Sequence, residues 1–159
     1  MAEYWLPDVN KLFSETESGK NRNGFTTKIL EPRDFQNLYV DEWSNALCAD
    51  RKNLDVLAVA AFDSDSKKTV GLAGCSADCD TMWQIGVDVL PGFRRKGIAS
   101  ALTMELAKET LRRGKIPFYC CAWSNIVSAR NAIRSGFRPA WCELTAKPID
   151  EIEKMNGER

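Results

Sequence analysis

Residues 82–103 read MWQIGVDVLPGFRRKGIASALT, and three patterns follow one another along them. An apolar, β-rich run from Met82 to Leu90 stops at Pro91-Gly92, which predicts a strand followed by a turn. A new apolar pattern then predicts a helix from about Arg95 to Arg113, with residues four apart at Ile98, Leu102 and Leu106. The basic residues between these two elements therefore lie at the start of a helix.

That position gives the hexad Arg94-Arg95-Lys96-Gly97-Ile98-Ala99 a chemical meaning. The first N–H groups of a helix lack intrahelical partners and the macrodipole adds positive charge, so the loop can hold a phosphate or pyrophosphate. Gly97 and Ala99 would let such a ligand approach the backbone. The helix dipole alone disfavours positive charge at this end of a helix, so the three basic side chains of the hexad indicate a function. The alternative is a solvated basic turn. The patterns of a P-loop and of a dinucleotide fingerprint are absent.

The rest of the chain predicts further elements on both sides of this segment. We expect strands over residues 25–30, 56–62, 70–76, 115–122 and 137–146, and helices over about 32–47 and 126–135. The helix over 32–47 carries an apolar stripe that includes Phe35 and Trp43. This order predicts the α+β class, with a mixed, mostly antiparallel sheet of five to six strands and helices on both faces.

Length and composition predict a single domain. A chain of 159 residues with 44% hydrophobic side chains can bury one substantial core. We expect a weakly ordered N-terminal segment over 1–24, one domain over 25–147, and a C-terminal tail over 148–159. Within the first segment only Tyr4 to Phe13 is expected to pack, as a short helix begun by Pro7.

Charge and cysteine usage narrow the class of partner. Twenty-two Lys and Arg balance 22 Asp and Glu, which argues against nucleic acid. We expect no membrane span, because no apolar run is long enough, and a cytoplasmic location. The six cysteines include one spaced pair, Cys75 and Cys79, and the chain has no histidine, so we expect no metal and interpret the cysteines as reduced thiols.

The basic hexad also resembles a known signature. Arg94-x-x-Gly97-x-Ala99 is similar to the Arg/Gln-x-x-Gly-x-Gly/Ala motif of the GCN5-related N-acetyltransferase (GNAT) family. Asn125, Ser128 and Gly136-Phe137 resemble the second block of that family. The sequences of residues 82–89, 123–125 and 139–141 are similar to those of a little-characterised bacterial branch of the family. Members of that branch carry extra N-terminal sequence, so the resemblance implies that this chain is a shortened form of such a protein.

The resemblance implies a fold, a cofactor and a reaction. It implies acetyl-CoA as co-substrate, a small-molecule or peptide amine as acceptor, and direct attack of the amine on the thioester, and it leaves a homodimer open. It implies that the backbone of Val89 and the side chain of Asn125 bind the pantetheine arm. It implies that the pyrophosphate is bound by the loop formed by Arg94, Arg95, Lys96, Gly97, Ile98, Ala99 and Ser100.

The sequence departs from the family at the position where many members carry a Tyr that protonates the leaving sulfur, because that residue here is Ala132. A base must come from a carboxylate or a water chain, and Asp88 and Glu42 are the two candidates. Their alternatives are a structural salt bridge for Asp88 and a solvated helix charge for Glu42. A non-catalytic CoA-binding regulator and a protein-interaction module remain the competing hypotheses for function.

Overall fold

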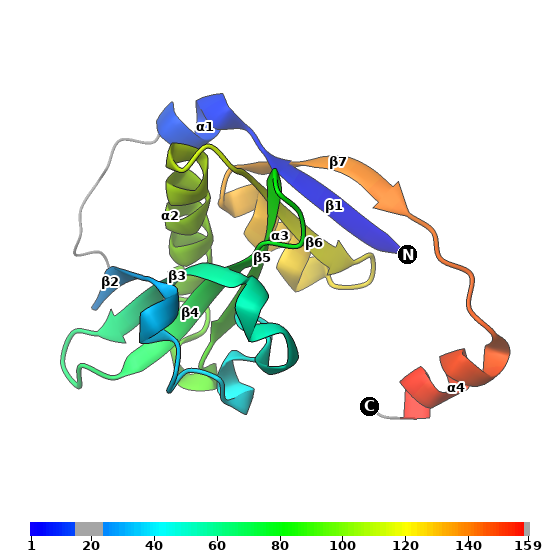
Figure 1. Ribbon diagram of the computed structural model, residues 1–159, viewed down its shortest axis with the longest axis horizontal. Helices are drawn as coiled ribbons and strands as arrows, with labels where there is room; N and C mark the ends of the chain where they lie inside the picture. The colour runs from blue at the N-terminus through cyan, green and yellow to red at the C-terminus, as the bar shows by residue number, and fades with distance from the viewer. Residues whose placement is uncertain (15–23, 158–159) are drawn as a thin grey trace.

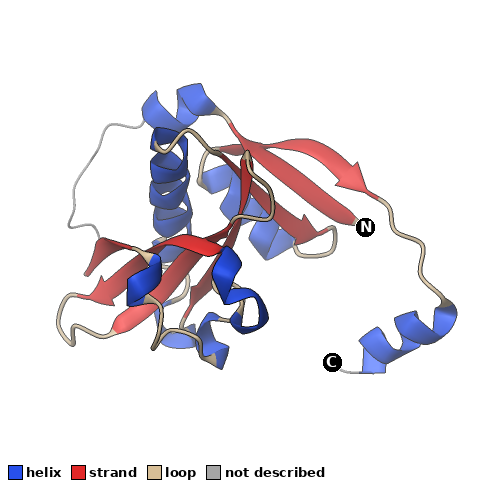
Figure 2. Ribbon diagram, viewed as in Figure 1, coloured by secondary structure: helices blue, strands red, loops and turns tan. Residues whose placement is uncertain are grey.

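One mixed sheet forms the centre of the computed structural model, which describes residues 1–14 and 24–157 (Figures 1 and 2). Within these residues the strand order is β2-β3-β4-β5-β6-β1-β7, and only β5 and β6 run parallel. The α+β prediction and the mostly antiparallel sheet are confirmed, whereas the predicted number of strands was too low. The strands are β1 (Ala2–Pro7), β2 (Phe25–Leu30), β3 (Asp55–Asp63), β4 (Thr69–Ser76), β5 (Met82–Val89), β6 (Ile116–Ala122) and β7 (Phe137–Glu143).

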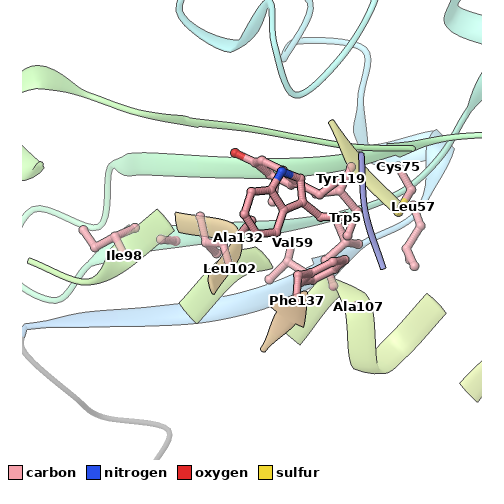
Figure 3. Close-up of a cluster of buried hydrophobic side chains, with 14 of the residues drawn as sticks. Trp5, Leu57, Val59, Cys75, Ile98, Leu102, Ala107, Tyr119, Ala132 and Phe137 are labelled. Atoms are coloured by element: carbon pink, nitrogen blue, oxygen red, sulfur yellow. The ribbon is translucent and has the colours of Figure 1, made fainter. Parts of the chain in front are cut away.

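Helix α2 (Ile98–Arg112) covers one face of this sheet. Its Ile98 and Leu102 pack with Leu57 and Val59 of β3 in a cluster of buried side chains (Figure 3). Helix α3 (Ile126–Arg134) is joined to α2 by a hydrogen bond from Asn131 Nδ2 to Thr103 Oγ1 of 3.1 Å. The apolar pattern predicted for residues 95–113 is therefore the stripe that faces the sheet.

The opposite face is covered by short 3-10 turns, so the continuous helix predicted over 32–47 is wrong. The turns are η1 (Pro32–Asp34), η2 (Asp41–Trp43) and η3 (Ala49–Leu54). Val40 is extended, with φ −130° and ψ 160°, which interrupts any helix there. The apolar stripe is buried all the same, because Phe35, Trp43 and Leu47 pack on Ala58, Ala60 and Leu72.

The N-terminal residues differ from the prediction as well. Instead of a helix begun by Pro7, the chain forms β1 up to Pro7 and then α1 (Val9–Ser14). β1 lies between β6 and β7 and pairs with both, and Trp5 and Leu12 are buried. The packed unit therefore includes Ala2–Ser14, of which the sequence had predicted that Tyr4 to Phe13 packs, but as a helix. Residues 15–23 of the predicted N-terminal segment lie outside the described residues.

The C-terminal helix α4 (Ile149–Gly157) falls in the segment predicted as a tail. It stands away from the sheet in Figure 1, and Ile149 is exposed. No helix in the described part of the chain is both long and apolar enough to cross a membrane.

Candidate cofactor and active site

Strands β5 and β6 separate part of the way along their length. Their parallel pairing runs from Met82 and Ile116 to Ile85 and Tyr119, and no further pair follows within the described residues. β5 nevertheless continues to Val89 and β6 to Ala122. β5 remains paired with β4 on its other side, so the gap leaves unpaired only the edge of β5 that faces β6, where a ligand can meet the backbone.

The loop after β5 ends in a strained turn at the start of α2. Arg95 has φ 61° and Gly97, the N-cap of α2, has φ 80°. A positive φ is uncommon for a residue other than glycine and is often found at functional sites. The first intrahelical bond runs from Ala101 N–H to the Gly97 carbonyl at 3.0 Å, so the earlier N–H groups have no acceptor inside the helix. These donors belong to the segment that the sequence predicted to bind an anion.

A cavity of about 810 Å³ joins the strand gap to this helix start. A Cβ added at Gly97 would meet no atom of this chain within 4 Å, so there is room beside the backbone. Most of the predicted cofactor residues line the cavity: Val89, Arg94, Arg95, Gly97, Ile98, Ala99, Ser100 and Asn125. Lys96 is not among the lining residues, and its ammonium lies 4.9 Å from the centre of the Phe93 ring.

Two predicted residues are held by hydrogen bonds. Arg94 Nε donates to the Val89 carbonyl at 3.0 Å, which fixes the loop to the end of β5. Asn125 caps α3, and its Oδ1 accepts from Ser128 N–H at 3.1 Å. The Nδ2 donors of Asn125 remain available to a ligand, since no described residue accepts from them.

The structure also brings Arg130 and Arg134 of α3 to the cavity, and sequence reasoning missed both. They add positive charge to the wall opposite the basic loop. Residues four apart on a helix share a face, so the spacing of these two arginines in the predicted helix 126–135 was the signal that could have found them.

The two candidate bases differ in position. Asp88 lines the cavity, and its carboxylate accepts hydrogen bonds of 2.9 Å from Asn45 N–H, 2.7 Å from Asn45 Nδ2 and 3.0 Å from Ala46 N–H. These bonds attach the 3-10 segment to β5, whereas the sequence had suggested a salt bridge as the structural role. Glu42 is exposed on η2 and is not part of the cavity wall.

Ala132, which stands where many family members carry the Tyr, is fully buried against the core (Figure 3). Tyr119 of β6 lies in the same cluster, and its hydroxyl is 2.7 Å from Ser128 Oγ. Ser128 in turn lines the cavity. Burial raises the pKa of Tyr119 above its ordinary value, so the phenol stays protonated at neutral pH.

The cysteines form no cluster with ligand geometry. Among the described residues no group of three His, Cys, Asp or Glu side chains could hold a metal ion. Cys75 is buried against Thr110 Oγ1 at 3.3 Å, and burial raises the pKa of its thiol to about 12. Cys120 and Cys121 face opposite sides of β6, and burial raises the pKa of both thiols.

The gap between parallel strands, the helix start beside it and the basic cavity are the arrangement expected of an acetyltransferase of the GNAT type. Residues 23–137 match the Acetyltransferase (GNAT) family, and this chain belongs to that family. Among curated proteins, none matches the sequence.

Solved structures support the fold. A GCN5-related N-acetyltransferase-like protein from Streptococcus suis is 19% identical with a TM-score of 0.63, covering 89% of this chain and 59% of its own. A GNAT-family acetyltransferase from Novosphingobium aromaticivorans is 15% identical with a TM-score of 0.62, covering 87% and 59%. The aminoglycoside N-acetyltransferase AAC(6')-Iy in complex with CoA is 16% identical with a TM-score of 0.57, covering 78% and 94%. This chain thus spans a little over half the length of the first two.

Proposed function

We propose that this chain is an acetyl-CoA-dependent N-acyltransferase that moves an acetyl group to an amine by direct attack. The observation that carries the proposal is the cavity that connects the gap between β5 and β6 with the N-terminus of α2. A cofactor with an anionic end and an extended arm needs such a connection. The family membership of the chain points in the same direction.

The chemistry of the cavity wall fits the cofactor from one end to the other. The pyrophosphate would be held by the backbone N–H groups of residues 95–100 and by the charges of Arg94, Arg130 and Arg134. The pantetheine arm carries amides, which would pair with the backbone of Val89 and with Asn125 Nδ2. When bound, the cofactor supplies the activated acetyl group, and the residues around it position that group.

The reaction needs little beyond positioning. The neutral amine nitrogen attacks the thioester carbonyl, the C–N bond forms, the C–S bond breaks with its electron pair staying on sulfur, and the nitrogen releases a proton to water or to the base. Holding the two reactants in contact lowers the barrier substantially. Unpaired backbone N–H groups near Val89 would stabilise the negative charge that develops on the carbonyl oxygen.

The amine must lose a proton before it attacks. Of the two proposed carboxylates, Asp88 is the one at the cavity, so a base at Asp88 could act directly or through water. The backbone hydrogen bonds that Asp88 accepts hold it in place for either role. Glu42 would have to act from the rim of the acceptor side.

A second candidate function is a CoA-binding regulator without catalysis. The observation that favours it is Ala132, which is buried and offers no proton at the usual position. Such a regulator would keep the cofactor cavity and lack turnover.

One pair of measurements separates these functions. The melting temperature is measured with and without acetyl-CoA at roughly 1 mM, and thiol release is followed with an aminoglycoside, a polyamine, an amino acid amide and a lysine-containing peptide. A raised melting temperature with amine-dependent thiol release supports the transferase. A raised melting temperature with no release above background for any amine overturns the transferase in favour of the regulator. An unchanged melting temperature overturns both.

A further inference from the structure

Four polar side chains form a row from the interior of α2 to the cavity. Asn131 Nδ2 donates to the buried Thr103 Oγ1 at 3.1 Å. The Asn131 side chain also acts on the Tyr119 hydroxyl, where it opposes the rise in pKa that burial causes. The Tyr119 hydroxyl lies 2.7 Å from Ser128 Oγ, and Ser128 is the member of the row that lines the cavity together with Asn131.

The Tyr119–Ser128 hydrogen bond can run in either direction, because each hydroxyl is both a donor and an acceptor. When Tyr119 donates to Ser128 Oγ, the Ser128 O–H is not used by that bond and can point into the cavity that Ser128 lines.

The row ends where the strands separate. Tyr119 and Ile85 form the last pair between β5 and β6, and Ser128 lines the same cavity as Val87 and Val89, which follow that pair on β5. The thioester must enter this cavity for its carbonyl to meet the unpaired edge of β5. A hydroxyl on the cavity wall can therefore reach the sulfur of a thioester held there.

We propose that Ser128 is a catalytic residue whose hydroxyl donates a hydrogen bond to the departing CoA thiolate, with Tyr119 as the positioning residue that orients it. This inference rests on the proposed transferase function. The C–S electron pair stays on sulfur, and Ser128 keeps its proton. Full protonation is unnecessary, because a thiol with a pKa near 8.5 leaves readily as the thiolate when it is hydrogen-bonded.

Tyr119 is not the donor itself, because it is 4% exposed and does not line the cavity. Its hydroxyl can reach the ligand only through Ser128. A serine and a buried tyrosine would thus do together what one exposed hydroxyl at residue 132 does in relatives that carry the Tyr.

The test uses the full chain and the amine that gives the fastest thiol release. Ser128→Ala is expected to lower kcat about 10- to 100-fold, the usual effect of losing one hydrogen bond to a charged group, with the Kd for CoA within about twofold. Ser128→Thr keeps the hydroxyl and is expected to retain most of the rate. Ser66→Ala is the matched control, because the Ser66 hydroxyl is also hydrogen-bonded, to Asp63 at 2.6 Å, and lies in the β3–β4 turn.

Tyr119→Phe keeps the ring in the core and removes the hydroxyl, so its effect separates orientation from packing. It is expected to lower kcat about fivefold, and the double variant with Ser128→Ala is expected to be no slower than Ser128→Ala alone. Additive losses would show that Tyr119 does not act through Ser128 and would overturn the assignment.

The remaining outcomes also decide the inference. Ser128→Ala at the wild-type rate overturns it, and so does a loss of rate matched by an equal loss of CoA affinity. If the wild-type chain binds CoA and releases no thiol with any amine, the proposed function fails first, and this inference fails with it.

Discussion

The two faces of the sheet are covered in different ways. On one face α2 runs for 15 residues with its own backbone bonds, and its buried residues are spaced by the helical period. On the other face residues 32–54 form three short turns, and the N–H groups of Asn45 and Ala46 are bonded by the Asp88 carboxylate from β5. The backbone hydrogen bonds of α2 are therefore mostly internal, whereas those of the turn segment include bonds to a residue more than 40 positions away along the chain.

This difference also divides the chemistry. The α2 side provides the N–H groups and cations of the cavity, which a helix start supplies by its geometry. The turn side lies over Gly74 and Gly86, where added Cβ atoms would overlap the carbonyl oxygens of Ala46 and Asn45. If the proposed function is correct, the face covered by α2 holds the cofactor and the face covered by the turns of residues 32–54 meets the acceptor. Each prediction below changes one covering and measures whether the other responds.

The largest effect is expected from Gly97→Glu on the α2 side. A carboxylate at the helix start would meet the phosphates and repel them, so CoA binding should be abolished while the fold remains. Binding is measured by calorimetry and folding by circular dichroism.

Gly114→Glu is the matched control, because Gly114 also has a positive φ, 73°, and also has no atom within 4 Å of an added Cβ. It ends α2 at the opposite end from the cavity, so it should have the same backbone cost and keep CoA affinity. Equal loss of affinity in both variants would show that backbone strain, and not the ligand loop, is responsible.

The next effect is expected from Gly86→Ala on the turn side. Its methyl group would overlap the Asn45 carbonyl oxygen, which is backbone and cannot rotate away. Overpacking of this kind costs about 1–3 kcal/mol or more of unfolding free energy, measured by urea titration. CoA affinity should largely persist in the folded fraction, since the helix start and the arginines of the cavity lie on the other covering. Gly92→Ala, with no atom within 4 Å, should leave the unfolding free energy nearly unchanged.

A loss no larger than that of Gly86→Ala is expected from Asp88→Ala, which removes the acceptor of three hydrogen bonds. Ala46 N–H has a second acceptor in the Trp43 carbonyl at 3.0 Å, and Asn45 is exposed, so water can replace part of what is lost. The unfolding free energy should fall by about 1–3 kcal/mol. Asp65→Ala in the exposed β3–β4 turn is the control. An Asp88 variant as stable as the control would mean that the turn segment does not depend on this carboxylate.

The same contrast explains what the sequence could predict. The strand over 25–30 coincides with β2, and the helix around α2 was found because its period of apolar residues is local. Residues 32–47 were predicted as one helix because their apolar residues have nearly helical spacing. The segment forms turns and not a helix because residues 45 and 46 contact Asp88, Gly74 and Gly86 of the sheet. A pattern of residues along the chain does not reveal such long-range contacts.

The position of β1 was missed for a related reason. Tyr4 and Trp5 face opposite sides of a strand that is paired on both edges, but six residues give little alternation to recognise. In the cavity, the hexad identified the helix start because its chemistry is carried by consecutive residues. The spacing of Arg130 and Arg134 indicates a shared helix face, but only the packing of α3 in the folded chain shows that this face meets the cavity and that Ser128 meets Tyr119.

The smallest effect is expected where the two coverings are joined. Arg113, just after α2, donates two hydrogen bonds to the Glu31 carboxylate, of 2.6 and 3.2 Å, at the point where the turn segment begins. The hydrogen bond from Arg113 lowers the pKa of Glu31 below its ordinary value. A carboxylate with a lowered pKa stabilises the fold above its unfolded pKa, about 4.3, and this contribution is lost as the pH falls through the folded pKa.

Glu31→Gln should therefore lower the unfolding free energy at pH 7 and approach the wild-type chain once the pH falls below the lowered pKa of Glu31. Because the two side chains are 40% and 31% exposed, water and salt screen the pair, and the difference at pH 7 should not exceed about 1 kcal/mol. Glu153→Gln on α4, where the carboxylate has no bonding partner among the described residues, should show no such pH dependence. If the difference in unfolding free energy between Glu31→Gln and the wild-type chain stays constant from pH 7 to pH 3, the contact between α2 and the turn segment does not depend on the charge of Glu31.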